Sequence, residues 1–269
     1  MDPLDPVITA LHAESRLRVW SLVITVFGDC VQHRGGAIST VRLGRLLGRI
    51  GVEPGALRTA LSRLGRDGWV DSERKGRLSH YRLSPSGLAR FTEATSRIYA
   101  APRQTPVEMW SLSSEGTPQT ALALGGLWLA PADAPQTGKP AFRLVGRLTD
   151  LAPVMRDSLI SADHATALRR LRDDLERFAA LPADPLTHAA ARTLLIHRWR
   201  RIVLRYPDLP RDLLPGDLGG DDPRARVAAA YRYLTPATEH WLDSVEGEIA
   251  AMPPADDSLH RRFHLALPA

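Results

Sequence analysis

The chain has 269 residues with 35 Arg or Lys against 30 Asp or Glu, which gives a formal net charge of +5. This length leaves room for two or three small domains, and the single cysteine, Cys30, excludes an intramolecular disulfide. No charged-then-apolar leader opens the chain, and the longest apolar run, Val19 to Gly28, is too short to cross a bilayer. We therefore expect a cytoplasmic protein with no membrane contact.

The positive charge is concentrated in the first part of the chain. Residues 1–103 contain 16 Arg or Lys against 9 Asp or Glu, whereas residues 104–269 contain 19 against 21. Because only Lys75 and Lys139 are lysines, part of the arginine content reflects codon usage, and the location of the charge is more informative than its amount. A local cationic excess is typical of a segment that binds a polyanion.

The first predicted helix spans about residues 15–31 and is unusually apolar for a surface helix. Neighbours must therefore cover it on more than one side, and these could belong to the same domain, to the next domain or to a second protomer. A further helix at 86–99 offers additional apolar cover through Leu88, Phe91 and Ile98. Cys30 follows the apolar stretch, which predicts a buried and unreactive thiol.

Two amphipathic helices are predicted next, a short one over residues 41–50 and a longer one that begins at Pro54. Proline suits a first helical position because its missing N–H would be unpaired there anyway, and Gly68 suits the C-terminal end. The buried stripe of the longer helix would consist of Leu57, Ala60, Leu61 and Leu64. Its opposite face and flank carry Arg58, Thr59, Ser62, Arg63 and Arg66.

A hairpin with a cationic tip follows this helix directly. Residues 69–70 and 79–83 resemble two short strands, and the turn Arg74-Lys75-Gly76-Arg77 holds three cations and the glycine of a tight reversal. The cations of such a tip repel one another unless a polyanion binds there. The order of helix, turn, helix and hairpin predicts a winged helix-turn-helix whose second helix reads a DNA groove.

Arginine can pair with a guanine edge, and arginine or a short hydroxyl side chain can hold a phosphate. The alternative is an ordinary amphipathic helix with a solvated, charged face. The predicted DNA-binding residues are Arg58, Thr59, Ser62, Arg63, Arg66, Arg74, Lys75, Arg77 and Ser79.

Beyond a proline-containing linker at 102–106 the predicted secondary structure changes twice, first to short strands and then to helices. Short strands are predicted at 107–112, 127–130 and 142–146, separated by Gly, Pro, Ser and Asp. From Ser161 onward the spacing of apolar residues predicts helices over 165–181, 187–206, 224–234 and 237–252.

Three arginines, Arg198, Arg201 and Arg205, fall on one face of the helix predicted over 187–206, with His197 nearby. Three stacked guanidinium groups are costly to hold together without anions, so this set is a candidate site for the phosphates of a ligand. The alternative is that the arginines pair with nearby acids such as Asp208 and Asp212.

Motifs of catalysis are not found in the sequence. There is no glycine-rich phosphate loop, no nucleophile elbow and no paired-cysteine spacing for zinc, and the nine histidines are scattered. Gly35-Gly36 after Arg34 is typical of a turn. We therefore expect a protein that is not an enzyme and that holds no metal or resident cofactor.

Two blocks of sequence carry a family resemblance. The first, within residues 16–100, includes Ser21–Asp29, Arg34-Gly35-Gly36, Leu57–Leu64 and Asp67-Gly68-Trp69; the second, within 185–243, includes Arg192–Arg201 and Leu213-Leu214-Pro215. In both blocks the chain resembles the PaaX-type repressors of phenylacetic acid catabolism. The resemblance implies an α+β, mainly α-helical protein in three parts. These are a winged helix-turn-helix domain at 15–101, a small, abbreviated ferredoxin-like α+β middle domain at 106–160, and an all-helical effector and dimerisation domain at 161–252.

The resemblance also implies a homodimeric repressor that binds a pseudo-palindromic operator in double-stranded DNA. An aryl-CoA thioester such as phenylacetyl-CoA would release it, with the CoA phosphates held by His197, Arg198, Arg201 and Arg205. A different acyl-CoA, a small acid or a protein partner is the alternative signal. Relatives bridge the first two middle strands with a long helix, whereas residues 113–126 allow only about two helical turns here.

Overall fold

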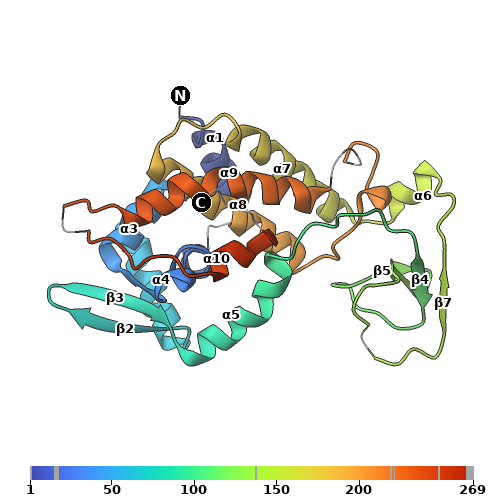
Figure 1. Ribbon diagram of the computed structural model, residues 1–269, viewed down its shortest axis with the longest axis horizontal. Coiled ribbons are helices and arrows are strands. Elements are labelled where there is room, and N and C mark those ends of the chain that lie inside the picture. The colour runs from blue at the N-terminus through green and yellow to red at the C-terminus, as the bar shows by residue number, and fades with distance from the viewer. Residues whose placement is uncertain are drawn as a thin grey trace.

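The protein is described by a computed structural model that places residues 2–14, 18–136, 138–218, 220, 222–247 and 249–264. Figure 1 shows a large, mainly helical body and a small lobe on the right that contains the second β-sheet. Buried side chains from the N-terminal and C-terminal parts of the chain join in one hydrophobic core within the large body. In the described part of the chain, no helix combines the length and the apolar character needed to cross a membrane.

The first apolar segment is buried on several sides by the same chain. A helix that the sequence analysis did not predict, α1 (Asp5–Glu14), comes first. It is followed by α2 (Val19–Val26), a π-helical turn η1 (Phe27–Val31) and a 3₁₀ turn η2 (Gln32–Arg34). Every residue from Leu22 to Val31 is buried, and α2 packs against helices α4 and α8, described below. The predicted burial of the Cys30 thiol is confirmed, while residues 15–17 of the predicted helix lie outside the described part.

The predicted order of helix, turn, helix and hairpin is present. The elements are β1 (Ala37–Ser39), α3 (Thr40–Arg49), α4 (Pro54–Arg66), β2 (Val70–Lys75) and β3 (Leu78–Leu83), and the strands form an antiparallel sheet in the order β1-β3-β2. Pro54 occupies the start of α4, as predicted. At the other end Gly68 takes a φ of +69°, and the Trp69 N–H donates to the Leu64 carbonyl at 2.8 Å.

Helix α5 (Pro85–Ile98) follows β3 and packs against α8. The Ser84 hydroxyl caps it by accepting from the Gly87 N–H at 3.0 Å. Ile98 is buried and Phe91 is half-buried, as apolar cover requires, but Leu88 is 43% exposed. Leu88 therefore lies on the outer face of the helix and does not cover the core of this chain.

The small lobe is built on a four-stranded antiparallel sheet in the order β5-β6-β4-β7. Its elements are β4 (Trp110–Ser113), β5 (Leu122–Leu124), β6 (Leu127–Pro131), β7 (Arg143–Gly146) and the following short helix α6 (Pro153–Ser158). Strands β4 and β5 run in the same direction with β6 between them, which is the arrangement of a split β-α-β unit. The connection over 114–121 is a loop with turns, so the long helix of the relatives has no counterpart in these residues, and β5 is a strand that was not predicted.

Three long helices form the C-terminal part of the large body: α7 (Ala162–Phe178), α8 (Pro185–Val203) and α9 (Pro223–Asp243). The predicted break between two helices near residue 235 is wrong, because α9 continues through Pro236. Burial of Leu234, Thr235, Thr238 and Trp241 along α9 outweighs the local cost of the proline.

Helix α8 is the centre of the body, since it packs against α2, α3, α5, α7 and α9. After α9 the chain is extended and then returns to the N-terminal part through α10 (Ser258–Arg261) and η4 (Arg262–His264). The Asp256 N–H donates to the His33 carbonyl at 2.8 Å, and the Phe263 N–H donates to the Tyr99 carbonyl at 2.8 Å. The last described residues therefore fasten together segments from both parts of the chain.

Candidate nucleic-acid interface and ligand pocket

One face of α4 is exposed and cationic. The predicted inner stripe of α4 is buried, which leaves the opposite face to solvent. The Arg63 Nε lies 3.4 Å from Asp67 Oδ2, and both side chains are about half exposed or more. An exposed ion pair of this kind contributes little, so little free energy opposes the transfer of Arg63 to a phosphate. The predicted α4 residues, all exposed, are Arg58, Thr59, Ser62, Arg63 and Arg66.

The hairpin β2–β3 projects from the body beside α4, on the left of Figure 1. Lys75 pairs with Leu78, so the reversal is a two-residue turn, and Gly76 supplies the φ of +63° that the turn requires. Arg74, Arg77 and Ser79 are exposed, while the Lys75 side chain lies outside the described part of the chain. Thr40 Oγ1 donates to the Ser79 carbonyl at 2.8 Å, which ties the hairpin to the start of α3.

The three arginines predicted as ligand-binding residues line one cavity of about 290 Å³ between α7 and α8. Arg170 contributes a fourth guanidinium group to its wall, and Asp163, Ile202 and Tyr206 also line it. The Tyr206 ring is stacked on the His164 ring with 4.2 Å between centroids, and the Arg205 guanidinium lies over the Tyr206 ring, 5.0 Å from its centroid. The arginines lining this arginine pocket are Arg170, Arg198, Arg201 and Arg205.

Acidic side chains contact the arginine pocket, but they are not those that the sequence analysis named. Arg205 lies 3.4 Å from Asp163, and Arg198 pairs with the buried Asp174. Asp208 instead accepts a hydrogen bond from Arg224 at 2.7 Å, and Asp212 lies 3.8 Å from Arg211. The pocket arginines therefore pair with acids, as the alternative expected, but not with Asp208 and Asp212. Both of these acids follow the turn after α8 and contact other arginines.

His197 does not line the arginine pocket. It is buried against α2, and its Nδ1 lies 3.1 Å from Thr25 Oγ1. Because the Thr25 hydroxyl donates its proton to the Ser21 carbonyl at 2.9 Å, the histidine must be the donor in this contact. Burial, together with Arg200, Arg201 and Arg198, lowers the pKa of His197 to about 3, so the ring is neutral.

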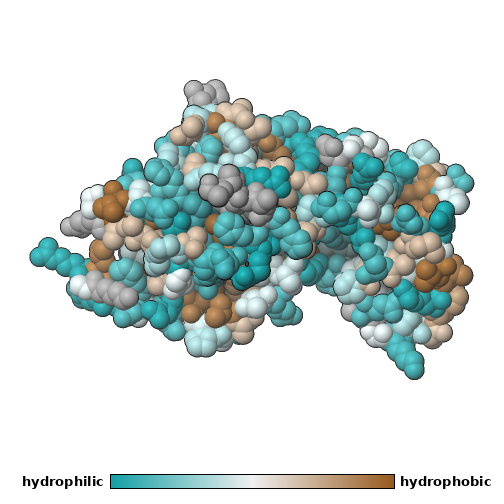
Figure 2. Space-filling model, in the orientation of Figure 1, coloured by the Kyte–Doolittle hydropathy of each residue, from teal (hydrophilic) through white to brown (hydrophobic). Residues whose placement is uncertain are grey.

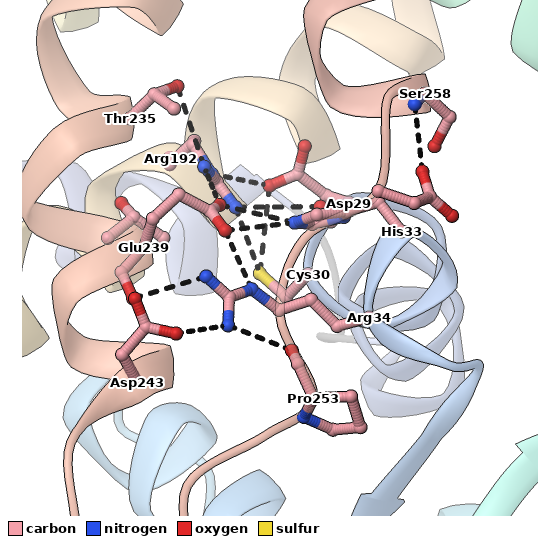
Figure 3. Close-up of polar contacts among 12 residues, drawn as sticks. Asp29, Cys30, His33, Arg34, Arg192, Thr235, Glu239, Asp243, Pro253 and Ser258 are labelled. Atoms are coloured by element: carbon pink, nitrogen blue, oxygen red, sulfur yellow. Dashed lines mark hydrogen bonds and ion pairs between the residues drawn. The ribbon is translucent and has the colours of Figure 1, made fainter. Parts of the chain in front are cut away.

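A buried network of charged side chains joins the N-terminal part to α8 and α9 (Figure 3). Asp29, in the π-helical turn, is fully buried and accepts hydrogen bonds from Arg192 at 2.9 Å, Tyr99 at 2.9 Å and Tyr231 at 3.0 Å. Arg262, from the end of the described chain, donates to the Asp29 carbonyl at 2.7 Å. Burial of a carboxylate is costly unless donors surround it in this way.

Glu239 of α9 is the second carboxylate of the network. It accepts from Arg192 at 2.7 Å, from Arg34 at 2.7 Å and from His33 at 3.1 Å. Burial alone would raise the pKa of Glu239, but Arg192, His33 and Arg34 lower it below its usual range. Burial raises the pKa of the neighbouring Cys30 thiol to about 12, with Asp29 adding to the effect.

Comparisons with known proteins decide the family. The family model described as PaaX-like protein matches residues 18–87, and that described as PaaX-like protein C-terminal domain matches 158–244. The transcriptional repressor PaaX of Escherichia coli (strain K12) is 31% identical, over 98% of this chain and 95% of that protein. The chain belongs to the PaaX family. The family assignment made from the two sequence blocks is thereby confirmed.

A likeness to a solved structure concerns the fold alone. The uncharacterized protein Rv0674 from Mycobacterium tuberculosis is 21% identical and superposes with a TM-score of 0.50, covering 81% of this chain and 93% of that chain.

The two segments that the PaaX family models match include both sides of the buried network. Asp29 lies in the first segment, and Arg192 and Glu239 lie in the second.

No role was predicted from the sequence for the residues of the network. A signal was available, because Asp29 interrupts an otherwise apolar segment and a buried charge requires partners. The partners themselves carry no such signal, since Arg192 and Arg262 are 163 and 233 residues away along the chain.

Proposed function

We propose that this PaaX-family protein is a DNA-binding transcriptional repressor. In this proposal α3, α4 and the β2–β3 hairpin form a winged helix-turn-helix, and α4 enters the major groove. The observation that carries the proposal is the exposed cationic surface shared by α4 and the hairpin. The excess of basic residues in the same part of the chain supports it, as does the name of the E. coli relative, a transcriptional repressor. The same features favour a regulator over an enzyme.

The test is operator affinity as a function of salt, with an operator fragment selected from random DNA by the protein itself. The logarithm of the affinity should fall linearly with the logarithm of the salt concentration, by about 0.9 for each phosphate contact. Arg77→Ala should reduce that slope by about 1, and Arg63→Ala should cost about 1–3 kcal/mol if Arg63 contacts a base. Arg232→Ala, at an exposed position on α9, is the control. Affinity that is insensitive to salt and to both substitutions would refute DNA binding through this surface.

We infer that the repressor binds its pseudo-palindromic operator as a homodimer, because one winged helix contacts few base pairs. We propose that the exposed apolar surface of the small lobe binds a second copy of this chain. Strand β7 lies at the edge of its sheet among the described strands, and an edge strand can pair with its own copy. Figure 2 shows brown side chains gathered on this lobe, and the exposed apolar residues of the β7 segment are Phe142, Leu144, Val145 and Leu148.

Sedimentation of the full chain tests the dimer. Leu144→Glu should convert it to a monomer and weaken operator binding, because it buries a charge in the apolar contact. Leu88→Glu places the same charge on an exposed leucine of α5 and should leave the dimer intact. A wild-type protein that is monomeric at micromolar concentration without DNA and binds DNA as a monomer would refute this part of the proposal.

We further propose that an aryl-CoA thioester, such as phenylacetyl-CoA, binds at the arginine pocket and releases the repressor from DNA. The phosphates would contact Arg198, Arg201 and Arg205, which line the cavity. Since His197 faces α2, its expected contact with the ligand is not part of this proposal. A different acyl-CoA, a small acid or a protein partner stays the alternative.

Thermal stabilisation by phenylacetyl-CoA tests the effector. Ligand at a hundredfold excess over its Kd stabilises the folded protein by about 2.7 kcal/mol. Arg201→Met should abolish most of that stabilisation. The absence of any shift at millimolar phenylacetyl-CoA would refute the effector proposal and leave DNA binding untouched.

A further inference from the structure

A narrow hollow of about 50 Å³ lies between α2, α5 and α8, where the N-terminal part meets the C-terminal helices. Its walls are mainly aliphatic, with Ile24, Ile98, Ile196 and Leu204 among the lining residues. None of its lining residues is shared with the arginine pocket, because residues 196, 200 and 204 lie on another face of α8. The hollow is therefore a separate site from the one proposed for the effector.

A guanidinium group without a carboxylate partner lines this hollow. Arg200 is half-buried, and its Nη1 donates to the Ser21 carbonyl at 3.2 Å and to Thr25 Oγ1 at 3.0 Å. Both acceptors are neutral, and no ion pair joins Arg200 to an acidic side chain among the described residues. Its other N–H groups donate to no described residue. A half-buried cation without a counter-ion is costly, and an anion bound in the hollow would offset that cost.

Aromatic side chains complete the site. Trp69 and Phe91 are both half-buried and line the hollow, and the Arg90 guanidinium lies 5.1 Å above the Trp69 ring. Phe91 is seated against Gly28, where a Cβ atom would lie 2.2 Å from its ring. Flat apolar surfaces beside an unpaired guanidinium are the complement of a molecule that carries an aromatic ring and a carboxylate.

We propose that this hollow is a binding site for an aromatic carboxylate. The carboxylate accepts hydrogen bonds from the unpaired N–H groups of Arg200, and the ring packs at the mouth against Trp69 and Phe91. A volume of about 50 Å³ holds the carboxylate group and leaves the ring in the mouth. A molecule bound there contacts α2, α5 and α8 at once, so it braces α2 and α5 against the central helix. The site lies apart from the arginine pocket and from the α4 surface, so its test is independent of the proposed function.

Titration calorimetry on the full chain, with benzoate as the probe, tests the proposal. Benzoate should bind, and benzamide and acetate should bind at least about tenfold more weakly, because one lacks the charge and the other the ring. Arg200→Met should weaken benzoate about tenfold or more, whereas Arg232→Met, which removes an exposed arginine of α9, should not.

Ala94→Leu provides a second variant should Arg200→Met fail to fold. Ala94 lines the hollow on α5, so the larger side chain fills it without changing any charge, and benzoate binding should again be lost. No benzoate binding at millimolar concentration in the wild type would overturn the proposal. Equal binding of benzoate and benzamide, or undiminished binding by Ala94→Leu, would also overturn it.

Discussion

The buried network makes the stability of this protein unusually dependent on one side chain, Arg192. Its guanidinium group is fully buried and contacts both carboxylates of the network, with Nε 2.9 Å from Asp29 and Nη1 2.7 Å from Glu239. Arg192→Met keeps most of the apolar volume and removes the charge. Asp29 then keeps Tyr99, Tyr231, the Cys30 thiol at 3.7 Å and the more distant Arg262 as side-chain donors.

Removing one partner of a buried ion pair costs about 3–5 kcal/mol, because the other partner is left as an uncompensated charge. The matched control is Arg205→Met. Arg205 also pairs with an aspartate, at 3.4 Å, but the two side chains are 67% and 74% exposed. Exposed pairs of this kind contribute about 0–1 kcal/mol. The two substitutions remove the same group, in one case from two buried carboxylates and in the other from a single exposed one, so their effects should differ widely.

Urea unfolding monitored by tryptophan fluorescence measures both changes. With a slope of about 3 kcal/mol per molar, the upper part of the range for small proteins, Arg192→Met should lower the midpoint by about 1 M or more. Arg205→Met should shift it by less than about 0.3 M. If Arg192→Met costs less than about 1 kcal/mol, the network does not depend on its central cation and the argument from burial is wrong.

Three further predictions follow from single buried positions. Because the folded-state pKa of His197 is about 3 and its ordinary value is 6.5, only the unfolded chain binds the proton between these values. Stability therefore falls as pH is lowered through this window, and His197→Gln should remove up to about 1.4 kcal/mol per pH unit from the slope measured by urea unfolding. Cys30 should be unreactive toward Ellman's reagent at pH 8 in the native protein and react fully in denaturant; native reactivity would contradict its burial. Gly28→Ala should cost about 1–3 kcal/mol in thermal unfolding because of the contact with Phe91, and a neutral effect would show that Phe91 moves freely.

Local signals were sufficient to predict the elements of the segment that we propose binds DNA. The stripe of four apolar residues, the proline at the start of α4 and Gly68 after its end all act within one or two helical turns. The same kind of signal failed where packing outweighs propensity. Pro236 predicts a helix end, yet α9 continues because its flanking residues are buried. In the small lobe, Gly116 sits against Trp128, where a Cβ atom would lie 2.5 Å from the ring, and the segment is a loop.

The candidate sites likewise differ in how far the sequence predicts them. The exposed cations of α4 and the arginine set of α8 could be placed from helical spacing, because side chains three and four residues apart share a face. Spacing did not distinguish His197 from its neighbours, although it turns toward α2. The network of Asp29 was beyond reach, since its donors come from four separate segments and only the folded chain brings them together.

The exposed and the buried arginines of this chain therefore have different roles. Arg63 is 62% exposed and loses little when it leaves Asp67, so it is available to a polyanion. Arg34, which is 2% exposed, donates to Glu239 and Asp243 and is held in place by both. The buried arginines fasten the N-terminal part onto α8 and α9, so the α4 surface is carried on a body that includes both. A displacement of α8 would therefore reach the N-terminal part through these ion pairs as well as through apolar packing.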